Sequence, residues 1–381
     1  MKRFLPALLL PLILLTAGCD RSSPITPSGK VVKIGFIGPH HGSDQDQGQN
    51  TLKGVRAGQT IIPLLKNGDR IEVIAEDSGN DPAATRRAMQ KLVQDEGVSA
   101  LLLGLNSQSL LQVMQFAESL QTPIIALTAT HPDIVSGSTF INQLCFNDDT
   151  QGAVAALFVR DELLIKRAAV IVDPGDPHSK QLQTAFEKKF TATSGILTGS
   201  HPVTEMDKEL LLHLQAQETE LLYLPISAQS LLQEQSTLEE MNWSPKIMAV
   251  DGLLASVLGQ FPEQAGNIDG IYATDVFSDS GDFVRHKRLG RAVEASFDGL
   301  FEGEKNTFTG LGVEGYAIVL YAMNQCLPAP DRQCINTAIR STRNFEGTMS
   351  KISIDSSGRA SRPVYVNTVE NGLLDSVVKV Y

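Results

Sequence analysis

The 381-residue chain carries a formal net charge of -11 at pH 7, with 43 acidic against 32 basic residues. An acidic chain without a basic stripe has no surface that neutralises phosphates, so nucleic acid is excluded as an expected partner. Hydrophobic residues make up 42% of the chain, as in ordinary globular proteins, and the length exceeds what one core usually organises. We therefore expect two domains.

The N-terminal residues 1–18 have the pattern of a bacterial secretion signal. A basic start and an apolar stretch are followed by small residues directly before Cys19, an arrangement that resembles the lipobox of bacterial lipoproteins. We expect the signal to be removed, Cys19 to be lipidated, and residues 19–30 to form a flexible tether. The protein would then lie in the periplasm or on the outer face of the cytoplasmic membrane, held by its lipid. An ordinary signal peptide with an incidental cysteine is the alternative.

Three further cysteines would face an oxidising compartment. Cys326 and Cys334 bracket a turn-like link between two helical patterns, which predicts a local disulfide. Cys145 would then be unpaired, most simply as a small buried apolar residue. A zinc site is the alternative, but the chain has no CxxC spacing.

Short apolar runs alternate with helical patterns along most of the chain, which predicts parallel sheets with helices on both faces. A helix is expected after Asp81, because this N-cap residue precedes Pro82, and another over residues 107–120. Residues 348–355 and 363–368, separated by the turn SSGR, predict a hairpin. Strands are expected at residues 31–37, 71–77, 99–103, 122–128, 168–172, 220–224, 246–250 and 270–274.

Six sequence blocks, taken in this order, resemble the type I periplasmic binding proteins, in the leucine/isoleucine/valine-binding group of ABC-transporter receptors. The resemblance implies an α/β fold of two doubly wound parallel-sheet lobes joined by three crossover strands, with the ligand in the cleft between them. It also implies an N-terminal lobe of residues 31–146 plus 276–346 and a C-terminal lobe of 147–275 plus 347–381. The blocks are VKIGFIGPHHG, EDSGNDPAATRRAMQKLVQDEGVSALLLG, TPIIALTATHPDI, NDDTQGAVAA, AVIVDPGDPHSKQL and NFEGTMSKISIDSSGRASRPVYVNTVENG.

Hydroxyl residues follow two of the predicted strands. Ser107 begins a predicted helix, and Thr128 and Thr130 end the next strand. A helix start offers free N–H groups to an anion, although plain capping and turn chemistry explain these residues equally well. The resemblance implies that they hold the carboxylate of an amino acid. Ser107 fits the family pattern only if one residue is deleted from the loop, so Gln108 is the alternative.

The resemblance implies that Asp251 takes the ligand's ammonium group, although an aspartate before glycine is often a turn residue. It further places Gln47, His178 and Ser227 at positions where relatives have aromatic rings against the ligand's apolar side chain. An apolar pocket gains roughly 25 cal/mol per Å² buried, so the loss of the rings argues against an aliphatic ligand. Polar groups reject ligands that lack matching partners, and we predict a small polar amino-acid-like ligand. A shifted alignment, with these side chains facing solvent, is the alternative.

Two other patterns indicate different chemistry. His40, His41, Asp44 and Asp46 could bind zinc or another divalent ion, but their loop lacks a fixed metal-binding spacing, and we predict no metal and no cofactor. Residues 310–315 match GxGxxG without following a strand, so we treat the match as false. The sequence has no GxSxG elbow and no P-loop, and we do not expect an enzyme.

Together these patterns predict an extracytoplasmic solute-binding lipoprotein that captures its ligand by closure of two lobes about a hinge. Its partner would be the membrane permease of an ABC transporter. A ligand-sensing receptor that signals to a membrane kinase or regulator is one alternative. A structural lipoprotein that has lost ligand binding is another.

Overall fold

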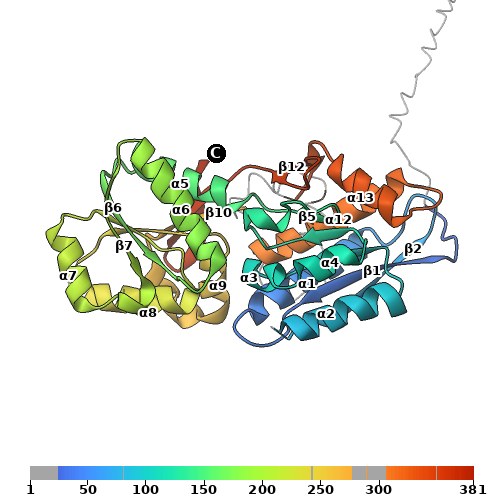
Figure 1. Ribbon diagram of the computed structural model, residues 1–381, viewed down its shortest axis with the longest axis horizontal. Coiled ribbons are helices and arrows are strands. Elements are labelled where there is room, and N and C mark those ends of the chain that lie inside the picture. The colour runs from blue at the N-terminus through green and yellow to red at the C-terminus, as the bar shows by residue number, and fades with distance from the viewer. Residues whose placement is uncertain (1–24, 80, 242, 277–288, 290–305, 349) are drawn as a thin grey trace, which may run out of the picture.

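The computed structural model describes residues 25–381 except 80, 242, 277–288, 290–305 and 349. It consists of two α/β lobes side by side (Figure 1). The predicted signal, Cys19 and residues 19–24 of the predicted tether lie outside the described residues. Among the described residues, no helix has both the length and the apolar character needed to cross a membrane.

The first lobe is built on a five-stranded parallel sheet in the order β2-β1-β3-β4-β5. Alternate residues of β1 face opposite sides, because side chains of a strand alternate: Ile34 and Phe36 enter one core cluster and Ile37 the other. Both faces are therefore covered. The strands are β1 (Val31–Gly38), β2 (Arg70–Asp77), β3 (Ala100–Leu103), β4 (Ile124–Ala126) and β5 (Ile141–Gln143).

Helices of the first lobe include a closely packed pair, α1 and α12, in which glycines allow the two backbones to approach. A Cβ on Gly54 would lie 2.1 Å from the carbonyl oxygen of Thr309, and one on Gly312 would lie 2.2 Å from that of Thr51. The GxGxxG residues lie inside α12. Gly312 and Gly315 allow close packing in the core, because a Cβ on either would collide with Thr51 or Leu127. The helices are α1 (Gln45–Ile61), α2 (Pro82–Gln90), α3 (Ser107–Leu111), α4 (Met114–Ser119), α12 (Thr307–Gln325) and α13 (Arg332–Arg340), with a π-helix at Lys91–Asp95 and a 3-10 helix at Pro132–Ile134.

The second lobe has a seven-stranded sheet in the order β15-β14-β10-β9-β8-β6-β7, in which only β14 and β15 run antiparallel to their neighbours. Its strands are β6 (Arg167–Val172), β7 (Ile196–Pro202), β8 (Leu221–Tyr223), β9 (Lys246–Ala249), β10 (Tyr272–Asp275), β14 (Tyr365–Glu370) and β15 (Leu373–Val380). Its helices are α5 (Asp148–Asp161), α6 (Pro177–Ala192), α7 (Lys208–Ala216), α8 (Ala228–Glu240) and α9 (Leu253–Gln260), with 3-10 helices at Val203–Glu205 and Pro262–Ile268. The predicted α/β class with parallel sheets is confirmed.

The predicted hairpin of residues 348–355 and 363–368 is wrong in its second arm. β12 (Lys351–Ile354) pairs with β11 (Phe345–Glu346) and with the two-residue β13 (Ala360–Ser361) in a small antiparallel sheet. The ladder stops there because Pro363 has no N–H to donate. The following residues form β14, which pairs with β10 and β15 in the second lobe. The small sheet is also bonded to the first lobe, where the Gln143 N–H donates to the Gly358 carbonyl at 2.8 Å.

The chain crosses between the lobes at residues 144–147 and 362–364. The remaining predicted crossover falls within residues 276–306, most of which lie outside the described residues, and the predicted lobe boundaries stay a prediction. Arg362 ties the last crossover to the first lobe, because its Nη1 donates to Glu314 Oε2 of α12 at 2.9 Å and both side chains are fully buried.

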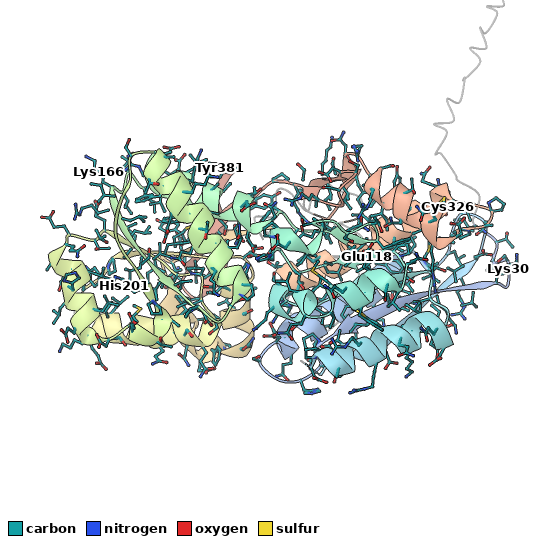
Figure 2. All side chains as sticks on the ribbon, in the orientation of Figure 1. Lys30, Glu118, Lys166, His201, Cys326 and Tyr381 are labelled. Carbon is teal, nitrogen blue, oxygen red and sulfur yellow. A yellow bond between two sulfur atoms is a disulfide. The ribbon has the colours of Figure 1, made fainter. Side chains whose placement is uncertain are left out.

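Two of the described cysteines form a disulfide far from the cleft, and the third lies in a crossover between the lobes. Cys326 and Cys334 form a disulfide between α12 and α13, and Figure 2 shows Cys326 on the first lobe at the end remote from the second lobe. Cys145 is unpaired and buried, and its Sγ donates to the Leu127 carbonyl at 3.2 Å. Burial raises the pKa of its thiol well above the usual value, so the thiol stays protonated and unreactive.

Candidate functional site

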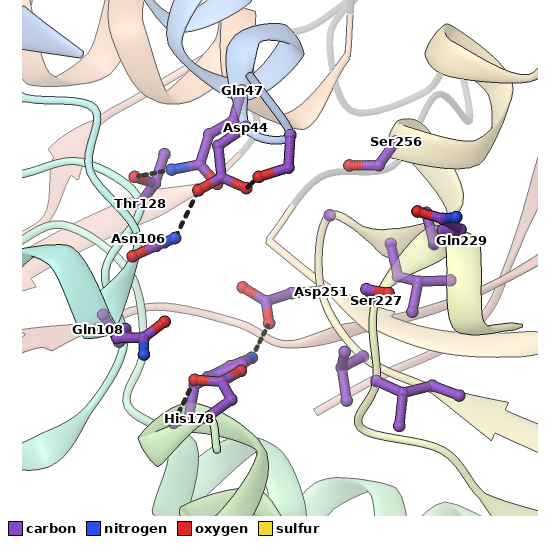
Figure 3. Close-up of a pocket in the computed structure, with 18 of the residues that line it drawn as sticks. Asp44, Gln47, Asn106, Gln108, Thr128, His178, Ser227, Gln229, Asp251 and Ser256 are labelled. Atoms are coloured by element: carbon purple, nitrogen blue, oxygen red, sulfur yellow. Dashed lines mark hydrogen bonds and ion pairs between the residues drawn. The ribbon is translucent and has the colours of Figure 1, made fainter. Parts of the chain in front are cut away.

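A cavity of about 340 Å³ lies between the two lobes, where the segments after β1, β3 and β4 face those after β8 and β9 (Figure 3). Carboxyl ends of parallel strands are the usual place for a ligand site in such sheets. All eight residues that the sequence nominated for ligand binding line this cavity: Gln47, Ser107, Gln108, Thr128, Thr130, His178, Ser227 and Asp251.

On the first lobe, α3 begins at Ser107 as predicted. The N-cap is Asn106, whose side chain accepts from the Ser109 N–H at 2.8 Å, so plain capping does not explain Ser107. Ser107 Oγ instead accepts backbone N–H groups of Thr130 at 3.1 Å and His131 at 3.2 Å. With both acceptor sites of the hydroxyl used, its proton is left to donate to a ligand. Gln108, the alternative, is exposed at the cavity rim.

Thr128 and Gln47 form a fixed part of the same wall. Gln47 Nε2 donates to Thr128 Oγ1 at 3.0 Å and to the Gly104 carbonyl at 3.3 Å. Thr128 Oγ1 in turn donates to the Leu105 carbonyl at 2.8 Å. These bonds position both side chains before any ligand arrives, so little side-chain freedom is left to lose on binding.

The polar segment of residues 40–50 is half helical, because α1 begins at Gln45. Gly48 permits this start, since a Cβ there would lie 1.9 Å from the Pro39 carbonyl oxygen. Asp44 occupies the N-cap position, yet its side chain caps no N–H of the helix. It accepts instead from Asn106 Nδ2 at 2.6 Å and from Ser43 Oγ at 3.3 Å, and it lines the cavity.

On the second lobe, Asp251 follows β9 and projects between the lobes (Figure 3). Its Oδ1 accepts from Gln151 Nε2 at 2.7 Å, and the same amide nitrogen donates to Thr274 Oγ1 at 2.8 Å. Burial raises the pKa of Asp251, while the positive charge of His178 opposes that rise. A buried carboxylate with its pKa raised binds a cation strongly, because the cation restores the interaction that water supplied.

His178 stands beside Asp251 and is the centre of the charged network. Its Nδ1 lies 3.0 Å from Asp148 Oδ1 and 3.1 Å from Thr130 Oγ1, and its Nε2 lies 3.9 Å from Asp251 Oδ1. Burial alone would lower the pKa of His178, but the charge and hydrogen bond of Asp148, with the charges of Asp251 and Asp176, raise it to about 10. His178 is therefore an imidazolium at neutral pH. Since Nδ1–H then donates, the Thr130 hydroxyl keeps its proton for a ligand.

Sequence reasoning did not find several of these residues. Asp148 is fully buried and holds His178, but an aspartate in the first turn of a helix is also explained by the helix dipole. Asp176 is the N-cap of α6, a position that favours aspartate without any ligand. Neither aspartate can therefore be identified as a site residue from a single sequence. Other cavity residues that were not predicted are Ser43, Asn106, Ile226, Ala228, Gln229, Val250, Gly252, Leu253, Ser256, Gln260, Phe261 and Phe308.

The residues weighed as metal ligands do not converge on one point. His41 Nδ1 pairs with Asp77 Oδ2 at 2.8 Å, whereas Asp46 Oδ1 accepts from Asn50 at 2.7 Å and Asp44 binds Asn106. In the described part of the chain, no group of three or more His, Cys, Asp and Glu side chains lies close enough together to hold a metal. The polar groups of the cavity can therefore serve as hydrogen-bonding and charged partners for a ligand.

Two α/β lobes with a cavity between them, lined by both polar and apolar groups, form the architecture of this chain. A family model described as periplasmic binding protein matches residues 31–373, so the chain belongs to the periplasmic binding protein family. The resemblance to the type I members of the leucine/isoleucine/valine-binding group is confirmed.

Relatives in this family share modest sequence identity with the chain. An amino acid binding protein of Pseudomonas aeruginosa is 24% identical over 312 residues, which cover 78% of this chain and 77% of the relative. The Leu/Ile/Val-binding protein BraC3 of Rhizobium johnstonii is 26% identical over 184 residues, covering 47% and 49% of the two chains.

Solved structures share the fold over nearly their whole length. A leucine binding protein from Thermotoga maritima gives a TM-score of 0.80 at 24% identity and covers 92% of this chain and 98% of its own. A solute binding protein of a Rhodopseudomonas palustris ABC transporter, in complex with p-hydroxybenzoic acid, gives 0.79 at 18% identity and covers 92% and 97%. These likenesses concern the arrangement of the two lobes.

Proposed function

We propose that this protein is an extracytoplasmic solute-binding protein of an ABC transporter and that it captures a small polar amino-acid-like ligand by closure of its lobes. One observation carries the proposal. Free hydroxyl donors of the first lobe, at Ser107 and Thr130, share one cavity with the Asp251 carboxylate of the second lobe. The relatives named above are named for binding solutes, which supports a binding role rather than catalysis.

The ligand carboxylate binds on the side of Ser107 and Thr130. Ser107 Oγ accepts two backbone N–H groups and keeps its own proton, and the Thr130 hydroxyl keeps its proton because a protonated His178 Nδ1 cannot accept it. The His178 imidazolium adds positive charge close to the same place, and hydrogen bonds to charged groups are stronger than neutral ones. An anionic group therefore has both donors and a counter-charge.

The ligand ammonium binds to Asp251, which belongs to the opposite lobe. The closed form is then stabilised because the ligand contacts both lobes at once, and only by as much as its contacts differ between the open and closed states. An amino acid has its carboxylate and its ammonium group on one carbon. It can therefore contact both Thr130 and Asp251, which lie on either side of His178.

Polar and apolar groups contribute about equally to the cavity surface. The resemblance implies that Gln47, His178 and Ser227 replace rings that would hold an aliphatic side chain, and Gln229, Ser256 and Gln260 also line the cavity. Apolar surface comes from Ile226, Val250, Leu253, Phe261 and Phe308. A polar side chain gains hydrogen bonds here that leucine cannot make.

The proposal includes a lipid on Cys19 that keeps the protein at the outer face of the cytoplasmic membrane, next to the permease that accepts its cargo. Replacement of Cys19 by Ser tests the anchor: fractionation should move the protein from the membrane to the soluble periplasmic fraction. Retention in the membrane fraction would contradict lipid anchoring at this residue.

Thermal melting of residues 20–381 against amino acids, amides and small organic acids tests the function. A ligand that binds only the folded chain raises the melting temperature in proportion to RT ln(1 + [L]/Kd). We expect a shift with a polar amino acid that disappears in Asp251→Ala. Larger shifts with leucine or valine would contradict the polar ligand, benzoates would contradict the amino-acid class, and silence across the library would contradict the binding function.

A further inference from the structure

The cavity has more acidic groups than a single ligand ammonium needs. Asp44, Asp176 and Asp251 line it, and Asp148 is buried behind His178. Among the described residues of the lining, His178 is the basic one, and its charge is already engaged by Asp148 and Asp251. Asp176 also faces the charge of His178, so the cavity carries more negative than positive charge and Asp44 is its least compensated carboxylate.

Asp44 is held toward the cavity at the expense of its local role. An aspartate at an N-cap position usually accepts from the first helical N–H groups, which stabilises the helix. Asp44 does not do so, and Asn106 Nδ2 binds its Oδ2 at 2.6 Å instead. Figure 3 shows Asp44 and Asp251 projecting into the same space from the two lobes. A fixed carboxylate that faces a cavity is an acceptor available to a ligand.

Asp176 brings a second carboxylate from the opposite lobe. It caps α6, where its Oδ1 accepts the His178 N–H at 3.0 Å. Burial raises the pKa of Asp44, and the charge of Asp176 raises it further against the hydrogen bonds from Ser43 and Asn106. Both carboxylates line the same cavity from opposite lobes, so like charges share it and a cation placed between them would be stabilised by both.

We infer, on the basis of the proposed function, that the ligand is a basic amino acid whose side-chain cation is held between Asp44 of the first lobe and Asp176 of the second. The α-ammonium group goes to Asp251 and the side-chain ammonium or guanidinium goes to the Asp44 side. The acceptors Ser43, Gln229 and Gln260 lie on the same cavity and complete the solvation of a cation. The second cation neutralises the like charges that meet when the lobes close.

Isothermal titration of residues 20–381 with L-lysine, L-arginine, L-glutamine and L-norleucine tests this inference. Norleucine has the chain length of lysine without its side-chain charge. We expect a basic amino acid to bind at least tenfold more tightly than norleucine and glutamine. In Asp44→Asn, the ratio of affinities for the basic amino acid and for norleucine should fall at least fivefold. In Asp176→Asn it should also fall, because the carboxylate charge is lost. The helix should stay intact in this variant, since asparagine is also a good N-cap.

Asp173→Asn is the matched control, because Asp173 lies in the loop of Asp176 and is not part of the cavity lining. Its ligand preference should equal that of the unsubstituted chain. If glutamine or norleucine binds as tightly as the basic amino acids, and Asp44→Asn leaves or raises their affinity, the inference is overturned while the proposed function stands. If none of these four binds but another amino acid of the melting screen does, the inference is overturned and the proposed function stands; if no compound of the screen binds either, both are overturned.

Discussion

The two walls of the cavity differ in the kind of polar group they present. Apart from Asp44, the first lobe contributes neutral groups that are already hydrogen bonded, such as Gln47 on Thr128 and Ser107 on the N–H groups of residues 130 and 131. The second lobe contributes the charges of Asp176, His178 and Asp251. Neutral groups cost little to leave facing water, whereas buried charges need partners.

This difference indicates an order of events in closure. The first lobe is a prearranged set of donors that can accept a ligand while the cleft is open. The charged second lobe gains most when the cleft closes, because charges interact more strongly once water is excluded. The contacts that differ between open and closed states are thus mainly electrostatic, and substitutions on the two walls should have unequal effects.

The largest effect is expected at Asp251. Asp251→Asn keeps the shape of the side chain and removes the charge, and loss of one partner of a buried charge pair costs about 2 kcal/mol or more, roughly thirtyfold in affinity. Isothermal titration with the ligand found in the melting screen measures this loss. Asp149→Asn, on the exposed first turn of α5 and outside the cavity lining, is the control and should bind normally. Equal affinity of Asp251→Asn and the unsubstituted chain would refute the difference between the walls.

The same carboxylate makes binding pH dependent. Burial raises the pKa of Asp251 above its usual value, so a lowered pH protonates it earlier than an exposed aspartate. Affinity for an ammonium ligand should therefore fall as the pH drops toward that raised pKa, and Asp251→Asn should weaken the dependence to the part that Asp44, whose pKa burial also raises, contributes. Titrations from pH 4 to 8 measure this dependence, and a parallel fall in the Asn variant would assign it to another group.

A smaller effect concerns stability and His178. Its pKa in the folded chain is about 10, above the ordinary value of 6.5, so the stabilisation is fully present below pH 6.5 and is lost as the pH rises toward 10. The free energy of unfolding should fall in this window with a slope of at most about 1.4 kcal/mol per pH unit. Urea unfolding at several pH values measures the slope. His178→Gln combined with Asp148→Asn should remove it, and an unchanged slope would show that another group is responsible.

The smallest loss of affinity is expected on the first-lobe wall. Ser107→Ala removes one neutral donor, which is worth about 1 kcal/mol, roughly fivefold in affinity. It also leaves two backbone N–H groups without their acceptor, so the melting temperature should fall as well. Ser109→Ala on the same helix, outside the cavity lining, should change neither quantity. A loss at Ser107 as large as that at Asp251 would remove the contrast between the two walls.

Strand prediction succeeded for most of the apolar strands and missed β5, β7 and β15. The predicted strand at residues 31–37 corresponds to β1, and the one at 71–77 to β2. β5 was missed because Asn142 and Gln143 interrupt its hydrophobicity, although both are buried and their amides donate to carbonyls of Ile124 and His131. β7 was missed because it is an edge strand with mostly half-exposed side chains. Such strands are defined by tertiary partners that a single sequence does not show.

Apolar alternation along the sequence determined the fold class, because it is a local property, and the resemblance of six sequence blocks to the family nominated eight residues that line one cavity. It also contained Asp44, Asp148 and Asp176, but each had a sufficient local explanation as a helix start or a solvated loop. Only the tertiary structure decided that Asp148 raises the pKa of His178 and that Asp44 faces the opposite lobe. The charge of a site depends on distances between segments, and those distances are fixed by the packing of the two lobes.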